Sequence, residues 1–241
     1  MMQRRFLLAG ASLLMLSACG GNLLGPPDAG TLYPVRPPFP AGSGEKVGWA
    51  LSILRPDVAA GLDTDRIALM QPDGSMDYYA KANFPDRVPP LVQQALLDAF
   101  EASGRIDAVA PEQAALHADY NLVTEVKDFA SHYAQADGIP KVTVSITAKL
   151  TTAHGRAIVG SFSTSQTVNA SVNSAGAAAQ ALQQALGAAV TQIVNWTLTA
   201  PMPPAQQSNA SPGASPGKPA EQLLHDSTRG SNQLRDKMPG Q

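Results

Sequence analysis

A run of strictly alternating side chains restricts the possible folds of this chain most strongly. Between residues 142 and 150, the even-numbered positions are apolar, and the odd-numbered positions carry threonine, serine and lysine. Period two is the repeat of a β-strand that buries one face and exposes the other. The turn-forming sequence Thr152–Gly155 follows, so residues 156–170 are expected to return as a neighbouring strand. Other parts of the chain must then cover the apolar face of this sheet.

Two helices are predicted to provide that cover. Residues 89–103 and 176–198 both place apolar side chains three or four positions apart, which is the spacing of one helix face. Pro89 and Pro90 suit a first helical turn, and Gly104 suits a C-terminal stop. Because the strands have polar outer faces, both main helices are expected on the same side of the sheet. The predicted fold class is α+β, a two-layer sandwich with a mainly antiparallel or mixed sheet.

The remaining elements are predicted from shorter patterns. Strands are expected over residues 49–54 and 120–129, and a β-hairpin is expected from residues 66–81. The sequence Pro72-Asp73-Gly74 lies at the centre of that hairpin and has the residues of a tight turn. Residues 105–109 and 111–116 are expected to form a short strand and a short helix.

Proline-rich segments lie on both sides of the predicted domain. Residues 20–47 contain six prolines and are expected to form an extended tether. Residues 201–241 contain seven prolines and no aromatic residue, so they cannot bury enough apolar surface to offset the chain entropy lost on folding. We therefore expect a disordered tail over 201–241 and one folded domain over residues 48–200.

The only cysteine of the chain, Cys19, follows a segment typical of exported proteins. Residues 1–18 begin with two arginines, continue with an apolar run over 6–16 and end in small residues, which is the organisation of a signal peptide. A short N-terminal membrane anchor is the alternative, although the run is shorter than the ~20 residues of a membrane span. A lone thiol can form no internal disulfide, and a metal site normally needs further ligands nearby.

The sequence Leu-Ser-Ala-Cys at 16–19 resembles the bacterial lipobox. The resemblance implies that the signal is cleaved between Ala18 and Cys19, and that Cys19 carries a diacylglycerol thioether and an acylated amine. Such an anchor would be stable, because each buried methylene contributes ~0.8 kcal/mol. Glycines follow the cysteine, where an aspartate favours inner-membrane retention in well-studied lipoproteins. The resemblance therefore implies the periplasmic face of the outer membrane.

Charge and aromatic content argue against binding to nucleic acid. The chain carries 17 Lys and Arg residues and 19 Asp and Glu residues. Removal of Arg4 and Arg5 with the signal leaves 15 basic against 19 acidic residues, a side-chain charge of −4. Nucleic-acid binding usually needs a basic patch, and base stacking needs aromatic side chains, which make up 5% of this chain.

The pattern of histidines predicts neither a metal site nor a catalytic site. The four histidines show no metal-ligand spacing with one another or with Cys19; they are His117, His132, His154 and His225. His154 is expected in a turn and His225 in the tail. A periplasmic hydrolase would need a clustered Ser/His/Asp set, to which only His117 and His132 could contribute. The chain also lacks a glycine-rich phosphate loop and a GxSxG motif, so we expect no catalytic residue and no cofactor.

Other polar and aromatic residues have structural interpretations. Asp63, Asp65 and Asp86 precede predicted elements, where carboxylates usually accept hydrogen bonds from backbone N–H groups. Tyr78 and Tyr79 should point to opposite faces of their strand, so one is expected in the core and the other exposed as a possible contact. Trp196, near the end of the last helix, is expected to contribute to packing rather than to recognition.

Several separated blocks of sequence resemble the ABC-type transport auxiliary lipoprotein family, the PqiC-like component of MCE (mammalian cell entry) lipid transport systems. The blocks are LDTDRIALM (62–70), DYYAKANFPDRVPPLVQQALLDAFEASG (77–104), ADYNLVTEV (118–126) and IVNWTL (193–198). They occur in the same order as in the family, and the resemblance covers roughly residues 30–200. Phe84 stands where the family usually has a tryptophan, which keeps an aromatic side chain there.

The resemblance implies a non-enzymatic periplasmic subunit held at the outer membrane. Its partners would be an MCE-domain periplasmic protein and, indirectly, an inner-membrane ABC permease and ATPase that move lipids between membranes. Related proteins can form homo-oligomeric rings. A structural outer-membrane assembly lipoprotein, of the secretion or lipopolysaccharide-assembly type, would share the same anchor and tether and is the alternative.

Overall fold

The alternating run forms the central strand of a three-stranded antiparallel unit in a computed structural model. This strand, β8 (Lys141–Thr152), pairs along its length with β7 (Tyr120–His132) and β9 (Ile158–Asn169). The apolar side chains at its even-numbered positions from 142 to 150 are completely buried. The polar outer face is joined by cross-strand hydroxyl contacts, such as Thr147 to Ser163 at 3.0 Å. The one-sided sheet predicted from period two is confirmed.

The structure describes residues 30–114, 117–154 and 156–200. The predicted signal peptide, Cys19 and the predicted tail over 201–241 lie outside these residues. Within the described part of the chain, no helix is long and apolar enough to cross a bilayer.

Three short strands continue the sheet on the other edge of β7. The strands β2 (Leu51–Ile53), β3 (Asp57–Val58) and β4 (Arg66–Met70) pair one after another with successive segments of β7, all in parallel. Outside them lie β5 (Met76–Asn83), antiparallel to β4, and β6 (Val109–Pro111), parallel to β2. β1 (Thr31–Leu32) then pairs with β5, which completes a mixed sheet of nine strands in the described residues.

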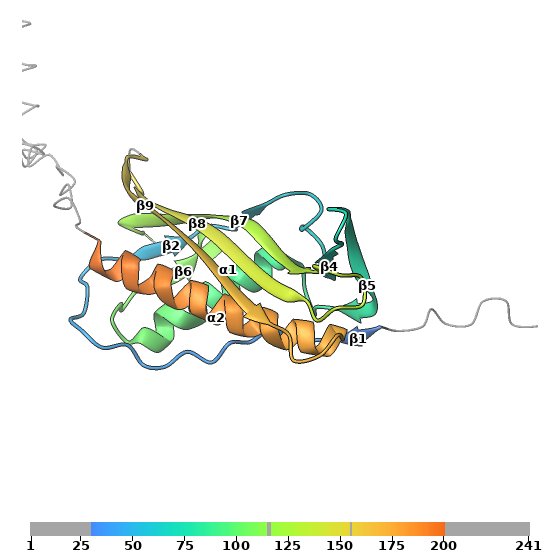
Figure 1. The fold of residues 1–241 in the computed structure, drawn as a ribbon. Helices are drawn as coiled ribbons and strands as arrows, with labels where there is room; N and C mark the ends of the chain where they lie inside the picture. Colours follow the sequence, from blue (N-terminus) through green and yellow to red (C-terminus); the bar gives the residue numbers. More distant parts are fainter. Residues whose placement is uncertain (1–29, 115–116, 155, 201–241) are drawn as a thin grey trace, which may run out of the picture. The chain divides into compact units, whose positions relative to one another are not determined.

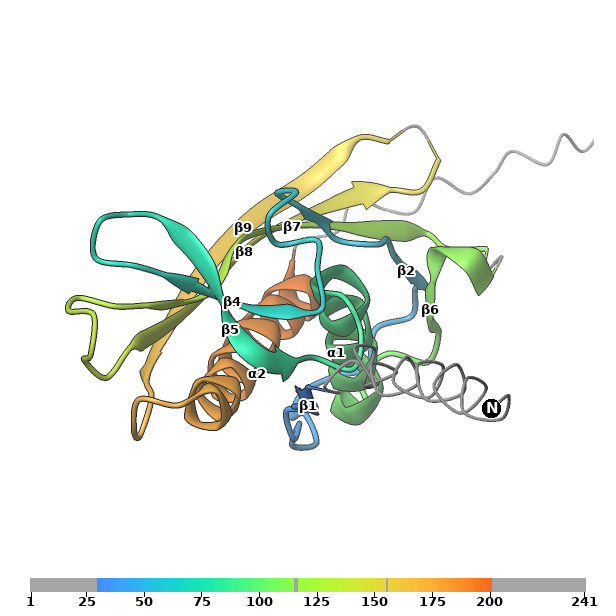
Figure 2. The ribbon, with the colours of Figure 1, turned by 90° about the vertical axis from the view of Figure 1, so that its right-hand side faces the viewer.

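Two helices cover one face of this sheet, α1 (Val88–Ser103) and α2 (Ala175–Thr199). Figures 1 and 2 show both helices beneath the same side of the curled sheet. As the sequence predicts, α1 has prolines in its first turn and ends at Gly104, whose φ of 62° is left-handed. α2 begins at Ser174, whose side chain accepts a hydrogen bond from the Ala177 N–H. The α+β fold with two helices on one face is confirmed.

The core lies between the helices and the sheet. Phe84, which follows β5, is buried and meets Phe129 of β7 edge to face, with ring centroids 5.7 Å apart. Phe100 and Leu96 of α1 are fully buried, which confirms the predicted inward face of this helix. The short elements differ from prediction: a strand occurs at 109–111 rather than at 105–109. Of the helix expected at 111–116, the described residues form a 3₁₀ turn, Glu112–Ala114, and residues 115–116 lie outside the described part of the chain.

Residues 30–47 belong to the folded domain, which corrects the expectation that the tether extends to residue 47. After β1, residues 33–47, here called the N-terminal strap, run along the outer side of the two helices (blue in Figure 1). Val35 is buried in the core, the Arg36 N–H donates to Gln183 of α2, and the Val47 N–H donates to the Arg105 carbonyl. The expectation failed because an extended proline-rich segment can still bury apolar side chains and make isolated backbone hydrogen bonds.

Candidate functional site

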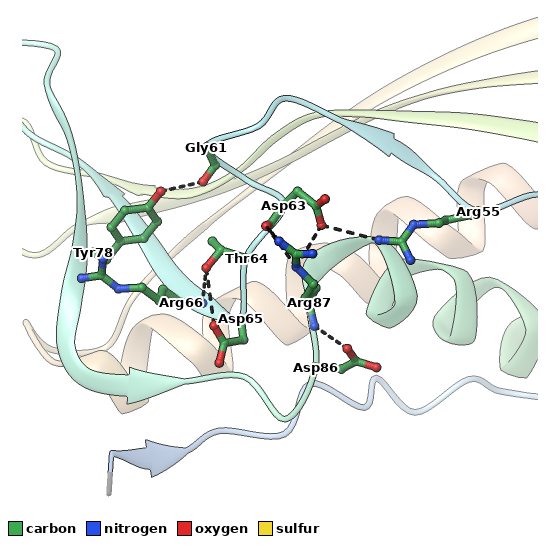
Figure 3. A network of polar contacts seen from close by, with 9 residues as sticks. All are labelled: Arg55, Gly61, Asp63, Thr64, Asp65, Arg66, Tyr78, Asp86 and Arg87. Carbon is green, nitrogen blue, oxygen red and sulfur yellow. Dashed lines mark hydrogen bonds and ion pairs between the residues drawn. The ribbon is translucent and has the colours of Figure 1, made fainter. Parts of the chain in front are cut away.

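A polar network holds the loop between β3 and β4, residues 59–65. The second half of this loop belongs to the block LDTDRIALM (62–70). Figure 3 shows Asp63 between two arginines that come from different parts of the chain. One Asp63 carboxylate oxygen lies 3.6 Å from Arg55 Nη2 and 3.3 Å from Arg87 Nε. The Asp63 side chain is about one-third exposed, so the two ion pairs are partly shielded from water.

Backbone contacts fix the same loop onto the start of α1. Arg87 also donates to the Asp63 carbonyl through Nη2 at 2.6 Å and Nε at 3.1 Å. The Phe84 and Val88 N–H groups donate to the carbonyls of Asp65 and Thr64. The loop is therefore joined to α1 by paired charges and by backbone hydrogen bonds.

The loop is attached on its other side to the β4–β5 hairpin. The Tyr78 hydroxyl donates to the Gly61 carbonyl at 2.8 Å, and the Arg66 guanidinium lies over the Tyr78 ring, 4.1 Å from its centroid (Figure 3). A guanidinium at this distance has a favourable cation–π interaction with the ring. These contacts make the loop a structural junction between β3, β4, β5 and α1.

The three aspartates follow the roles that the sequence suggested only in part. Asp65 accepts a hydrogen bond from the Thr64 hydroxyl at 3.5 Å rather than from a backbone N–H. Asp63 forms ion pairs with side chains instead of accepting backbone hydrogen bonds, and it is Thr64 that accepts a hydrogen bond from the Arg66 N–H. Asp86 does accept from a backbone group, the Arg87 N–H at 2.7 Å, although no side chain caps the start of α1. None of these carboxylates lies in an arrangement that suggests acid–base chemistry.

A groove of about 680 Å³ lies beside this network, between the outer side of α1 and the N-terminal strap. Four prolines contribute to its walls, Pro37, Pro85, Pro90 and Pro111, and their rings give it stiff sides. Polar side chains share the lining; they are Arg36, Asp86, Gln93, Gln94, Asp98 and Gln113. A mixed lining of this kind would leave many polar groups without water against an acyl chain, and it suits an extended polypeptide better.

The histidines within residues 30–114, 117–154 and 156–200 do not assemble a catalytic set. His132 lies on β7 with its Nε2 atom 2.8 Å from Asp128 Oδ2. Burial raises the pKa of the Asp128 carboxyl, and the His132 contact opposes this only in part. The neighbouring Ser131 is fully buried on the opposite face of β7, so its hydroxyl cannot join the pair. His117 and His154 are not hydrogen-bonded to this pair.

The described part of the chain also contains no cluster of side chains that could bind a metal ion. Nowhere in residues 30–114, 117–154 and 156–200 do three or more His, Cys, Asp or Glu side chains gather closely enough to hold an ion. Cys19 and His225 fall outside these ranges, so the predicted lipidation at Cys19 stays a prediction.

Tyr78, Tyr79 and Trp196 are all partly buried. Tyr78 and Tyr79 do not divide into a core residue and a free one, because both hydroxyls are bonded: Tyr78 to Gly61, and Tyr79 to the Tyr133 hydroxyl at 2.8 Å. Trp196 stacks on Phe162 with centroids 5.5 Å apart, which is the packing role expected of it. Tyr133, whose hydroxyl also donates to Asn173, could not be predicted from the sequence, because a lone tyrosine after a strand has no distinctive pattern.

These features define an α+β domain with a groove between α1 and the N-terminal strap. The chain belongs to the family of ABC-type transport auxiliary lipoprotein components, because the model of that family matches residues 31–194. The match begins at β1 and so includes the N-terminal strap. Family membership supports a lipoprotein of the cell envelope that is associated with an ABC transport system.

Comparisons with individual proteins agree with this family but are less informative about function. A crystal structure of protein XCC0632 from Xanthomonas campestris has 28% identity and a TM-score of 0.65, and the alignment covers 70% of this chain and 94% of that one. A second structure, of an uncharacterized protein, has 14% identity and a TM-score of 0.55 over 69% of this chain and 99% of that one, so it supports the fold alone.

A curated relative is known from sequence. Uncharacterized protein bll6063 from Bradyrhizobium diazoefficiens is 28% identical over 135 residues, which are 56% of this chain. The chain spans 36% of the length of that relative. The relative's remaining length therefore gives no information about this protein.

Proposed function

We propose that this protein is a non-catalytic docking subunit of an MCE-type ABC transport system that moves lipids between membranes. The observation that carries the proposal is the family match over residues 31–194, which covers nearly all of the described fold. In this proposal an MCE-domain periplasmic protein is the direct partner. An inner-membrane permease and ATPase are indirect partners, and ATP is hydrolysed by another chain.

The proposed anchor is a lipidated Cys19 in the outer membrane. With the N-terminal strap packed on the domain, ten residues separate Cys19 from Gly30, where the described structure begins. The maximum extended length of this linker is about 40 Å. A tether that continued to residue 47 would have a maximum length of about 90–100 Å. The domain would therefore stay close to its membrane, and the partner must approach that surface.

The groove beside α1 is the part of the proposed docking subunit that we assign to the partner polypeptide. Its stiff proline walls need little ordering on binding, which lowers the entropy cost of association. Anchoring both proteins in one envelope also raises their effective concentration, so a modest direct affinity would suffice. Assembly of this chain into a homo-oligomeric ring stays a further prediction of the proposal.

The anchor is tested by labelling cells with a fatty-acid analogue. The wild-type chain should take up the label, and the Cys19→Ala variant should not. Equal labelling of both would refute the anchor at Cys19, and binding of the partner at the groove would still be tested separately.

Docking is tested with the purified Cys19→Ala domain and the MCE-domain protein. Asp98→Arg places a long cation in the groove and should weaken binding at least tenfold. Glu101→Arg, an exposed position on the same helix outside the groove lining, should leave binding unchanged and is the matched control. If the Cys19→Ala domain without a groove substitution does not bind the MCE-domain protein, the assembly-lipoprotein alternative is favoured. If Asp98→Arg and Glu101→Arg have equal effects on binding, the groove is not the docking site.

A further inference from the structure

Large apolar side chains are exposed mainly at one end of the domain. In the described residues, five such side chains are more than 40% exposed: Leu32, Met76, Ile139, Ile158 and Val172. Leu32, Met76, Ile139 and Val172 belong to β1 and to three loops or strand ends at the end where the described chain begins (right in Figure 1), and Figure 2 shows these segments spread across that end. Ile158 lies at the opposite end, in the β8–β9 hairpin (Figure 1).

Contacts between these segments fix them as one surface. Ile139 is followed by Pro140, whose carbonyl accepts from the Ala170 N–H in the loop that carries Val172. The same loop is held by the Asn173 side chain, which accepts from the Tyr133 hydroxyl. The Tyr133 N–H in turn donates to the Met70 carbonyl, and Met70 pairs with Met76 across the β4–β5 hairpin.

Leu32 is attached to this surface through the start of α2. The ring of the adjacent Tyr33 lies against Gly176, so close that a Cβ at that position would be 3.2 Å from Tyr33 Cε1. Gly176 follows Ser174, whose N–H donates to the Val172 carbonyl. Leu32, Ile139 and Val172 are joined in this way, whereas Met76 lies at the first residue of β5 and Leu32 pairs with Asn83 at its last. The four side chains are therefore spread across this end of the domain, which we call the N-terminal end surface.

We propose that the N-terminal end surface rests against the lipid membrane to which the protein is anchored. This proposal rests on the proposed anchoring at Cys19. The linker of ten residues reaches at most about 40 Å and joins the domain at this end. The 25-residue helix α2, which runs from this end to the other, is itself about 37 Å long. The opposite end could touch the membrane only if the linker were almost fully stretched along the domain, which would cost most of its conformational entropy.

The charges around this surface indicate what kind of contact it makes. Asp73, Asp77 and Asp137 lie near it together with Lys81 and Lys141, so neither sign dominates strongly. Electrostatic attraction to anionic lipid is therefore weak, and the contact depends on burial of apolar side chains at the interface. A few such side chains would not recruit the free domain, but they suffice to orient a domain that is already anchored.

The test uses the full lipidated chain on vesicles of phosphatidylethanolamine and phosphatidylglycerol. Because lipidation consumes the only native thiol, one introduced cysteine can be labelled with an environment-sensitive fluorophore. Ile139→Cys reports on the N-terminal end surface, and Ile158→Cys is the matched control, since both side chains are more than half exposed. The emission of the label at position 139 should shift to the blue and be quenched by lipids that carry quenchers in their acyl chains, at low and high salt alike. The label at position 158 should show on the vesicles the same emission that it shows in water.

Flotation with the vesicles separates the failure of the anchor from the failure of the orientation. A chain that does not float would overturn the proposal together with lipid anchoring. A chain that floats with both labels in a water-like environment, or with a shift at position 158 alone, would overturn the orientation and leave the anchor intact. A shift at position 139 that occurs only after addition of the MCE-domain protein would assign this surface to a protein partner and would also refute membrane contact.

Discussion

Replacement of Val35 by alanine tests whether the N-terminal strap is a structural part of the domain. The Val35 side chain is 4% exposed and belongs to the same hydrophobic core as α2. The change removes two buried methyl groups, each worth about 0.8 kcal/mol of transfer free energy. The neighbouring Pro34 cannot adjust its φ freely, so a residual cavity should remain and bring the loss in unfolding free energy to about 2 kcal/mol.

Urea denaturation of the mature Cys19→Ala chain measures this loss. The midpoint should fall with an unchanged m-value, and the melting temperature should drop by about 4–8 °C. Val172→Ala removes the same atoms from a side chain that is 56% exposed, and it should change the unfolding free energy by less than about 0.5 kcal/mol. If the two variants have the same stability, the strap does not pack on the core, and residues 30–47 act as the tether expected from their composition.

Three further predictions concern the helices and the tyrosine pair. Phe100→Ala should cost about 3–5 kcal/mol in the same denaturation assay, because its ring is fully buried, and a loss below about 1 kcal/mol would place that face of α1 on the surface. Gly187→Leu should cost about 1–3 kcal/mol, since even a Cβ there would lie 3.0 Å from Pro37 of the strap, whereas Leu at the exposed Ala188 should be tolerated. The pKa of Tyr133 is raised by burial and, to a smaller extent, by the hydrogen bond with Tyr79. The resulting contribution to the unfolding free energy should be fully present below the pKa of an unfolded tyrosine, about 10, and should decline as the pH rises above it. Tyr133→Phe should reduce that alkaline decline in a pH series of melts, and an unchanged decline would assign it to other groups.

Local patterns in the sequence were sufficient to predict the main layers of the fold. The alternation over 142–150 defines β8 and its buried face, and Pro89, Pro90 and Gly104 define the ends of α1 within one residue. These signals are local, since period and terminal residues act within one element. The parallel pairing of β2, β3 and β4 along a single edge of β7 is non-local, and no pattern within such short strands predicts it.

The candidate site could be predicted only in part, for a similar reason. Asp63 lies in the block LDTDRIALM, but its partners are Arg55 and Arg87, and nothing in the spacing of these residues indicates that they meet. The prediction of a tether over residues 20–47 was wrong for the strap. A proline-rich composition indicates that a segment forms no regular helix or strand, but it does not indicate whether the segment packs on a domain. Its hydrogen bonds with Gln183 and Arg105 span long sequence separations, and these leave no periodic pattern.

The most direct test of the docking role is complementation by a form of the protein that is exported but not anchored. A Cys19→Ala chain with a cleavable signal should fold in the periplasm and bind the MCE-domain protein in vitro, because the described domain contains the proposed docking groove. It should nevertheless fail to restore lipid transport in a deletion strain, since the subunit is no longer held at its membrane. We therefore expect binding without complementation. Full complementation by the unanchored form would contradict it.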